Sequence, residues 1–222
     1  MSAAVIFLAG ASRGVGWEVA RCLRQRSLPV VALLRSNAAQ AELEAMGVQV
    51  VWGDALEAAA VERAMLAQPV HAVISTIGGL SREGQRSDFL GNKNLVDAAV
   101  KAGVQRFVLV SSIGSGESAK ALPPNVLAAL QPVLLEKAQA ENYVMASGLP
   151  YTIIRPGGLK SEPATGQAVL TTDVAIAGSI HRADVAALVC QCLQSERAVN
   201  QVLSAVDRQM MYGNSSVDVF VP

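Results

Sequence analysis

The first half of the chain alternates short, largely apolar runs with segments in which apolar residues recur at helical spacing. The runs are residues 4–8, 30–34, 48–54, 71–79 and 106–112. Largely apolar strands separated by helices are what a parallel sheet covered on both faces requires. The pattern therefore predicts an α/β protein, a single doubly wound domain over residues 1–222 whose mostly parallel sheet has about seven strands. Ligands of such a domain bind beyond the carboxyl ends of the strands.

A glycine-rich turn follows the first apolar run and precedes a helical segment. Gly10, Gly14 and Gly16 let the backbone turn sharply and approach a ligand, so that N–H groups and the positive end of the helix dipole point at a phosphate. A dinucleotide pyrophosphate is the natural ligand of such a turn in a Rossmann domain. The spacing GxxxGxG is not the commonest dinucleotide fingerprint, so an ordinary glycine-rich connection is the alternative.

The end of the second run carries a basic residue where dinucleotide-binding domains often have an acidic one. Arg35 follows Gly16 by 19 residues, at the place where an acid would bind the 2′-hydroxyl of NAD. An arginine there favours the 2′-phosphate of NADP, through a charge-assisted bidentate contact. Arg13 can approach the same phosphate from the other side. The expected cofactor is therefore NADP(H). The alternative is that Arg35 is an ordinary solvated surface charge, which would account for one arginine better than for two near the same phosphate.

The third and fourth runs also end in residues suited to a nucleotide. Asp54 can accept a hydrogen bond from the adenine amine, and Ala55 would line the same pocket. The alternative role of Asp54, compatible with the first, is to cap a helix beginning at Leu56. Thr76 and Gly78 have little side-chain bulk, which suits a backbone that lies against the cofactor ribose.

Composition narrows the classes of function. Of the 222 residues, 18 are Lys or Arg and 18 are Asp or Glu, which argues against a nucleic-acid binder or an anionic-membrane binder. No span reaches the roughly 20 apolar residues of a membrane helix. Three cysteines in apolar surroundings indicate buried free thiols in a reducing compartment. We expect a cytoplasmic monomer or homodimer.

Three later segments carry a family resemblance: KNLVDAAVKAGVQRFVLVSS (93–112), KAQAENYVMASGLPYTIIRPGGL (137–159) and HRADVAALV (181–189). Together with the glycine turn, they resemble the atypical branch of the short-chain dehydrogenase/reductase family. This branch includes the NmrA-like and the flavin reductase/biliverdin reductase B-like NAD(P)H-binding proteins. The resemblance covers about residues 4 to 205, and several motifs in the right order are more specific than any one of them.

The resemblance implies roles for individual residues. Around the phosphates it implies Gly10, Ser12, Arg13, Gly14, Val15, Gly16 and Arg35, the last followed by Ser36. It implies Asp54 at the adenine and Gly78 at the ribose. The catalytic set would be Ser111 and Ser112, facing the nicotinamide, and Lys137, binding the nicotinamide ribose. Pro156, Gly157, Gly158 and Leu159 match the turn that packs against the carboxamide. Turn chemistry in a stretch rich in turn formers is the alternative for the two serines.

One departure from the family pattern bears on the reaction. Conventional members have a proton-donating tyrosine four residues before the lysine, and this chain has Val133 there. A placed proton donor contributes on the order of a hundredfold to ten-thousandfold in rate, so the usual ketone or alcohol reaction is disfavoured. Tyr143 lies six residues beyond Lys137, on a different helix face, and Tyr151 lies in a predicted strand. Neither replaces the missing tyrosine simply.

The sequence therefore favours an NADPH-dependent oxidoreductase that passes hydride to a flat conjugated acceptor, such as a flavin, a quinone or a biliverdin-like tetrapyrrole. Two alternatives stay open: a non-catalytic NADP(H) sensor or assembly factor, and an isomerase or epimerase that uses a tightly held nucleotide. The acceptor pocket is expected along loops near 113–131 and 160–180, which are long for connections in a compact domain.

Overall fold

The computed structural model describes residues 4–80, 84–213 and 217–222. Its main strands are β1 (Ile6–Ala9), β2 (Val30–Leu34), β3 (Gln49–Trp52), β4 (Ala72–Ser75), β5 (Arg106–Val110), β6 (Tyr151–Pro156), β8 (Ala168–Thr171) and β10 (Gln201–Asp207). They form one eight-stranded sheet in the order β3-β2-β1-β4-β5-β6-β10-β8. All neighbours are parallel except β8, which runs antiparallel to β10. The predicted doubly wound architecture is confirmed, with eight strands where about seven were expected.

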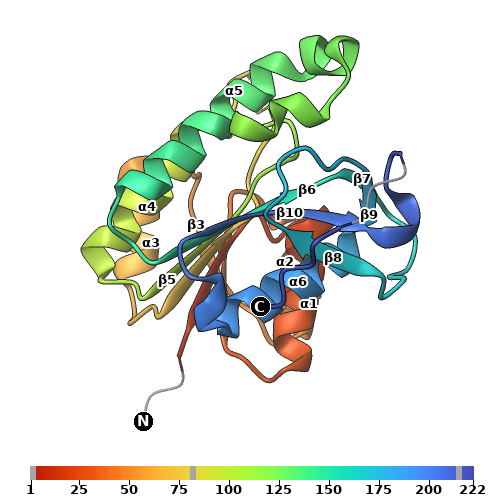
Figure 1. Cartoon of the computed structure of the whole chain (residues 1–222). Helices are drawn as coiled ribbons and strands as arrows, with labels where there is room; N and C mark the ends of the chain where they lie inside the picture. The colour runs from red at the N-terminus through yellow and green to blue at the C-terminus, as the bar shows by residue number, and fades with distance from the viewer. Residues whose placement is uncertain (1–3, 81–83, 214–216) are drawn as a thin grey trace.

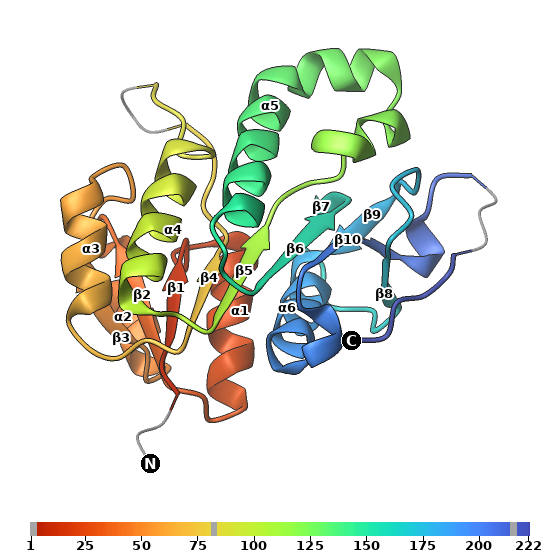
Figure 2. The same ribbon diagram turned by 60° about the vertical axis from the view of Figure 1, so that its left-hand side comes forward.

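Helices cover both faces of this sheet (Figures 1 and 2). One layer holds α1 (Gly14–Gln25), α2 (Gln40–Ala45) and α6 (Arg182–Gln194); the other holds α3 (Ala58–Leu66), α4 (Leu90–Ala102) and α5 (Pro124–Ala146). Short 3-10 helices span Asn37–Ala39, Gly116–Ala121, Glu196–Ala198 and Arg208–Met210. Among the described residues, no helix has both the length and the apolarity needed to cross a membrane. The expected cytoplasmic location and oligomeric state stay predictions.

The apolar runs are continuous because each strand feeds two cores. Successive side chains of a strand point to opposite faces, so Ile6 and Leu8 pack with α1 and α6 while Phe7 and Ala9 pack with α3, α4 and α5. All four residues are at most 3% exposed. Two-sided burial of this kind excludes the polar alternation of a half-exposed strand.

The three cysteines are free, as expected, but they are not equally buried. Cys190 and Cys192 are buried in α6, whereas Cys22 in α1 is only partly buried. A hydrogen bond with the Cys190 thiol lowers the pKa of Cys22 to about 6, and the same contact raises the pKa of Cys190. The pair lies between α1 and α6, away from the strand ends.

Residues 113–131, expected as a loop, are mostly helical. Gly116–Ala121 form a 3-10 helix and α5 begins at Pro124. Proline suits the first position of a helix because its missing N–H has no partner there. Pro132 lies inside α5, and Figure 2 shows the long helix bent. The description of this segment as a loop is therefore wrong, because the proline pair begins the helix.

Residues 160–180 are also more regular than expected. They contain β8, the eighth strand of the sheet, and they connect β7 (Gly158–Lys160) to β9 (Ser179–His181). β7 and β9 pair in parallel as a separate two-stranded sheet. This small sheet lies next to the carboxyl end of β6, so the segment adds a wall at the edge of the main sheet.

The strand order fixes where a ligand can enter. The chain runs from β1 outward to β3, then crosses back so that β4 pairs on the other side of β1. The two connections leave β1 and β4 in opposite directions, which opens a crevice beyond their carboxyl ends. The glycine turn after β1 and the small residues after β4 meet at this crevice.

Candidate functional site

A groove of about 1090 Å³ runs along the carboxyl ends of the central strands. It brings together nearly all the residues predicted from the sequence. They are Gly10, Ser12, Arg13, Gly14, Val15, Gly16, Arg35, Ser36, Asp54, Ala55, Thr76, Gly78, Ser111, Ser112, Lys137, Pro156 and Gly157. Gly158 is the exception: it begins β7 and is not among the lining residues.

The glycine turn is held in shape by close backbone contacts. Gly10 has φ of 93° and Gly14 has φ of 60°, a region that side chains disfavour. A Cβ on Gly16 would lie 2.1 Å from the Gly10 carbonyl oxygen, so α1 can approach the turn only with glycine there. The Thr76 hydroxyl donates to the Ala9 carbonyl at 3.1 Å and fastens the turn to the end of β4.

The N-terminus of α1 faces the groove without a neutralising group. Its first turn holds no acidic residue, and the side chain of the N-cap residue Arg13 makes no capping hydrogen bond. Free N–H groups and the helix dipole at such an end bind anions. The turn and the helix together therefore fit a pyrophosphate.

Arg35 stands at the carboxyl end of β2 with its side chain exposed, as Arg13 does across the groove. Within residues 4–80, 84–213 and 217–222, neither arginine has a carboxylate partner. Two unneutralised cations on one groove fit the 2′-phosphate of NADP better than a bare ribose hydroxyl. The assignment of these two residues stays a prediction.

Asp54 lines the groove and shapes the turn after β3. Its Oδ1 accepts from the Leu56 N–H at 2.9 Å, and its carbonyl accepts from the Glu57 N–H. α3 begins at Ala58 with Glu57 as its N-cap. The prediction that Asp54 caps a helix beginning at Leu56 is therefore wrong. Asp54 closes a preceding turn instead, and it lines the groove from there.

Lys137 and Val133 lie one turn apart on the side of α5 that lines the groove. The Lys137 ammonium lies 3.1 Å from Oδ1 of Asp88, a carboxylate with no exposed surface. The other oxygen of Asp88 accepts from the Gly79 N–H at 2.8 Å. A Cβ on Gly78 would lie 2.5 Å from the Asp88 carboxylate. One buried acid thus fixes both the lysine and the backbone after β4.

We expect Asp88→Asn to weaken NADPH binding about tenfold, because the isosteric amide keeps the Gly79 contact but removes the charge that holds Lys137. Calorimetric titration with NADPH measures the effect. Asp97→Asn is the matched control, since Asp97 also pairs with a lysine, Lys93, but does not line the groove. An unchanged affinity in the Asp88 variant would show that the ion pair is only structural.

The two serines after β5 differ in their surroundings. The Ser111 hydroxyl donates to Glu141, which is 1% exposed and forms an ion pair with Arg155 at 2.7 Å. The Ser112 hydroxyl donates to the Ile113 carbonyl at 2.9 Å. Both serines line the groove, and both have their only hydroxyl hydrogen directed into the protein.

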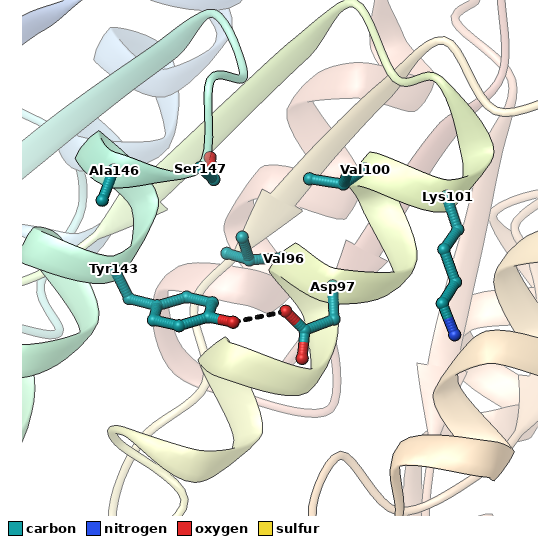
Figure 3. A pocket seen from close by; sticks show the side chains of 7 residues that line it. All are labelled: Val96, Asp97, Val100, Lys101, Tyr143, Ala146 and Ser147. Atoms are coloured by element: carbon teal, nitrogen blue, oxygen red, sulfur yellow. Dashed lines mark hydrogen bonds between the residues drawn. The ribbon is translucent and has the colours of Figure 1, made fainter.

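Tyr143 lies outside the groove, in a separate pocket of about 460 Å³ between α4 and α5. Figure 3 shows its hydroxyl pointing at Asp97, to which it donates at 2.6 Å. This hydrogen bond, together with burial, raises the pKa of Tyr143. Tyr151 packs at the edge of the core beneath α5. Among the described residues, neither tyrosine takes the place vacated at Val133.

Several residues that line the groove, and Glu141 behind it, were not predicted from the sequence. Asp88 and Glu141 are buried acids whose partners come from distant segments, so no local pattern indicates them. Arg182 at the start of α6 lies near Gly14 and donates to Ser161 at 2.7 Å. The sequence did contain a signal for Arg182, because it is a basic residue at the start of the predicted helix in HRADVAALV. Leu80, which was not predicted, and Leu159, which was expected from the family turn, line the groove while 57% and 38% exposed.

The expected acceptor segments contribute little to this groove. None of residues 113–131 lines it, and only Ser161 does so from within residues 160–180. The first segment is held away because it forms a 3-10 helix and the projecting first turns of α5. A role for either segment in acceptor binding stays a proposal.

A family model described as NAD(P)H-binding matches residues 10–196. The chain belongs to this NAD(P)H-binding family. It is 34% identical to the chloroplast protein At2g34460 of Arabidopsis thaliana, over 97% of this chain and 81% of that protein. It is 32% identical to the Bacillus subtilis protein YhfK, named an uncharacterized sugar epimerase, over 91% and 94%.

The solved structure of ChuY from Escherichia coli O157:H7, described as an anaerobilin reductase, superposes with a TM-score of 0.84. It is 36% identical to this NAD(P)H-binding protein, over 92% of this chain and 97% of that one. A sanguinarine reductase and an NAD(P)H azoreductase also match, and the chain spans about half the length of each, 52% and 48%. The expected cofactor and the expected class, an NAD(P)H-dependent oxidoreductase, are confirmed; the acceptor is not.

Proposed function

We propose that this protein is an NADPH-dependent reductase of a flat conjugated small molecule, a flavin, a quinone or a bilin. The observation that carries the proposal is the apolar part of the groove lining. Val133 lines the groove at the position of the family tyrosine, and Leu80 and Leu159 line the same groove with 57% and 38% of their surface exposed. A pocket of this kind binds apolar rings and provides no hydroxyl acid at the reacting end.

The remaining lining residues fit NADPH. Free N–H groups at the start of α1 bind the pyrophosphate, and Arg35 with Arg13 binds the 2′-phosphate. The Lys137 ammonium, fixed by Asp88, holds the nicotinamide ribose through the N–H groups that the acid does not use. When bound, NADPH supplies a hydride. The protein's own contribution is to bind, orient and desolvate.

The absence of a hydroxyl acid at position 133 favours acceptors that do not require one. Extended conjugated rings spread the charge that arrives with the hydride, so their protonation can come from solvent. The named activity of ChuY, the reduction of a bilin, is consistent with this class of acceptor. The name of YhfK keeps an epimerase as the competing activity.

The test is to follow NADPH absorbance with FMN, a quinone and biliverdin, beside calorimetric titration of NADPH. We expect submicromolar binding and turnover of at least one acceptor. Leu80→Glu should lower that turnover about tenfold without changing NADPH affinity, because a charge at the groove mouth opposes an apolar ring. Leu135→Glu is the control, since Leu135 is 58% exposed on α5 but does not line the groove.

Tight NADPH binding with no turnover of any acceptor would overturn the reductase proposal and favour a cofactor sensor. Interconversion of a nucleotide sugar without net NADPH consumption would favour the epimerase. The two outcomes differ in their products, so one set of incubations with the wild-type protein separates them.

A further inference from the structure

A buried polar network lies directly behind the groove. Ser111 follows β5, Glu141 lies on α5 one turn beyond Lys137, and Arg155 lies in β6. Their exposed fractions are 6%, 1% and 5%. Arg155 binds Glu141 with two contacts, Nε to Oε1 at 3.1 Å and Nη2 to Oε2 at 2.7 Å, and Ser111 Oγ meets the same Oε1.

The chemistry of the three groups fixes where the hydrogens lie. A guanidinium stays protonated in proteins and has donors only, so both Glu141 oxygens face a donor from Arg155. A carboxylate paired in this way only accepts hydrogen bonds. The short contact between Ser111 and Glu141 therefore uses the one hydrogen of the serine hydroxyl.

The hydrogen bond to Glu141 limits how the Ser111 hydroxyl can bind a ligand in the groove that it lines. With its hydrogen directed at Glu141, the hydroxyl presents lone pairs and no donor. Ser112 is committed in the same way, through its donation to the Ile113 carbonyl. The hydroxyls of Ser111 and Ser112 can therefore accept hydrogen bonds from a ligand in the groove, but they have no hydrogen left to donate to it.

We propose that Glu141 is a positioning residue that holds Ser111 as a hydrogen-bond acceptor for the carboxamide N–H of the nicotinamide ring. The inference rests on the proposed function for the placement of the nicotinamide at the end of β5. It assigns Ser111 to recognition of the cofactor ring. It also removes Ser111 as a proton donor to the acceptor, because its only hydrogen is directed away from the groove.

The test compares the dissociation constants of NADP⁺ and its 3-acetylpyridine analogue, in which a methyl group replaces the amide nitrogen. The analogue keeps the carbonyl oxygen but has no N–H to give Ser111. The wild-type protein should bind NADP⁺ about tenfold more tightly than the analogue, the effect of one hydrogen bond to a buried acceptor. Ser111→Ala should bring the ratio close to one, mainly by weakening NADP⁺. Ser118→Ala is the control, since Ser118 is buried but bonds only to its own turn.

The role of Glu141 is tested with the same ratio. Glu141→Met removes the acceptor that holds the Ser111 hydrogen, which is then free to turn toward the groove, so the ratio should fall toward one. Should that variant fail to fold with Arg155 left unpaired, the double variant Glu141→Met/Arg155→Met removes both charges together and should give the same fall.

A ratio near one in the wild-type protein, or an unchanged tenfold ratio in Ser111→Ala, would overturn the assignment of Ser111. An unchanged ratio in the Glu141 variant would overturn the positioning role. Failure of the folded wild-type protein to bind NADP⁺ at all would instead contradict the proposed function. Because the readout is a ratio of affinities, it is independent of which acceptor the enzyme reduces.

Discussion

Replacing Arg35 by aspartate should weaken NADPH binding about a hundredfold or more while changing NADH binding less than about threefold. The guanidinium at the end of β2 is exposed to the groove and has no carboxylate partner in the described part of the chain. Its loss removes charge-assisted hydrogen bonds to the 2′-phosphate, and the new carboxylate repels the same phosphate. NADH has no phosphate there.

Calorimetric titration of both cofactors measures the effect of this substitution. Arg63→Asp is a suitable control, because it makes the same change of charge at an exposed position on α3 that does not line the groove. Equal losses for NADPH and NADH would show that Arg35 does not bind the 2′-phosphate. Arg13 would then be the candidate for that contact.

Gly16→Ala should lower affinity for NADPH and NADH alike, by about a hundredfold, since two or more charge-assisted N–H contacts are lost together. The added Cβ would lie 2.1 Å from the Gly10 carbonyl oxygen and 2.5 Å from the Thr76 hydroxyl. α1 must then move away from the turn, which carries its N–H groups away from the pyrophosphate. Overpacking of this kind also costs about 1–3 kcal/mol of stability.

Thermal unfolding, measured beside cofactor titration, separates the two effects of the alanine at position 16. Gly148→Ala is the matched control: its φ is 79°, so alanine is strained there, yet no atom lies within 4 Å of the new Cβ. It should lose stability and keep its cofactor affinity. Normal affinity in the Gly16 variant would contradict the role of the turn as a phosphate site.

Features set by short stretches of sequence were predictable. The turn from Gly10 to Gly16 and the position of Arg35 depend on a strand, a turn and a helix that are adjacent along the chain. The structure places them in one groove because parallel strands bring their carboxyl ends to the same edge. The position of Val133 beside Lys137 followed from helical spacing alone.

Features set by contacts between distant segments were not predictable. Asp88 meets Lys137 across 49 positions of sequence, and the hydroxyl of Ser111 meets Glu141 across 30. Nothing near either acid indicates its partner. The segment 113–131 was predicted as a loop, but Pro124 suits the first position of a helix and begins α5 there.

Val133, Lys137 and Glu141 follow one another at four-residue intervals along α5, but they differ in their contacts. Lys137 and Glu141 each form an ion pair with another segment, whereas Val133 is partly exposed toward the groove and carries no polar bond. A substitution at position 133 therefore changes the side chain offered to the groove and leaves both ion pairs of α5 in place. Along this helix, the contacts that hold the fold and the surface that meets a ligand belong to different residues, so mutagenesis can alter one without the other.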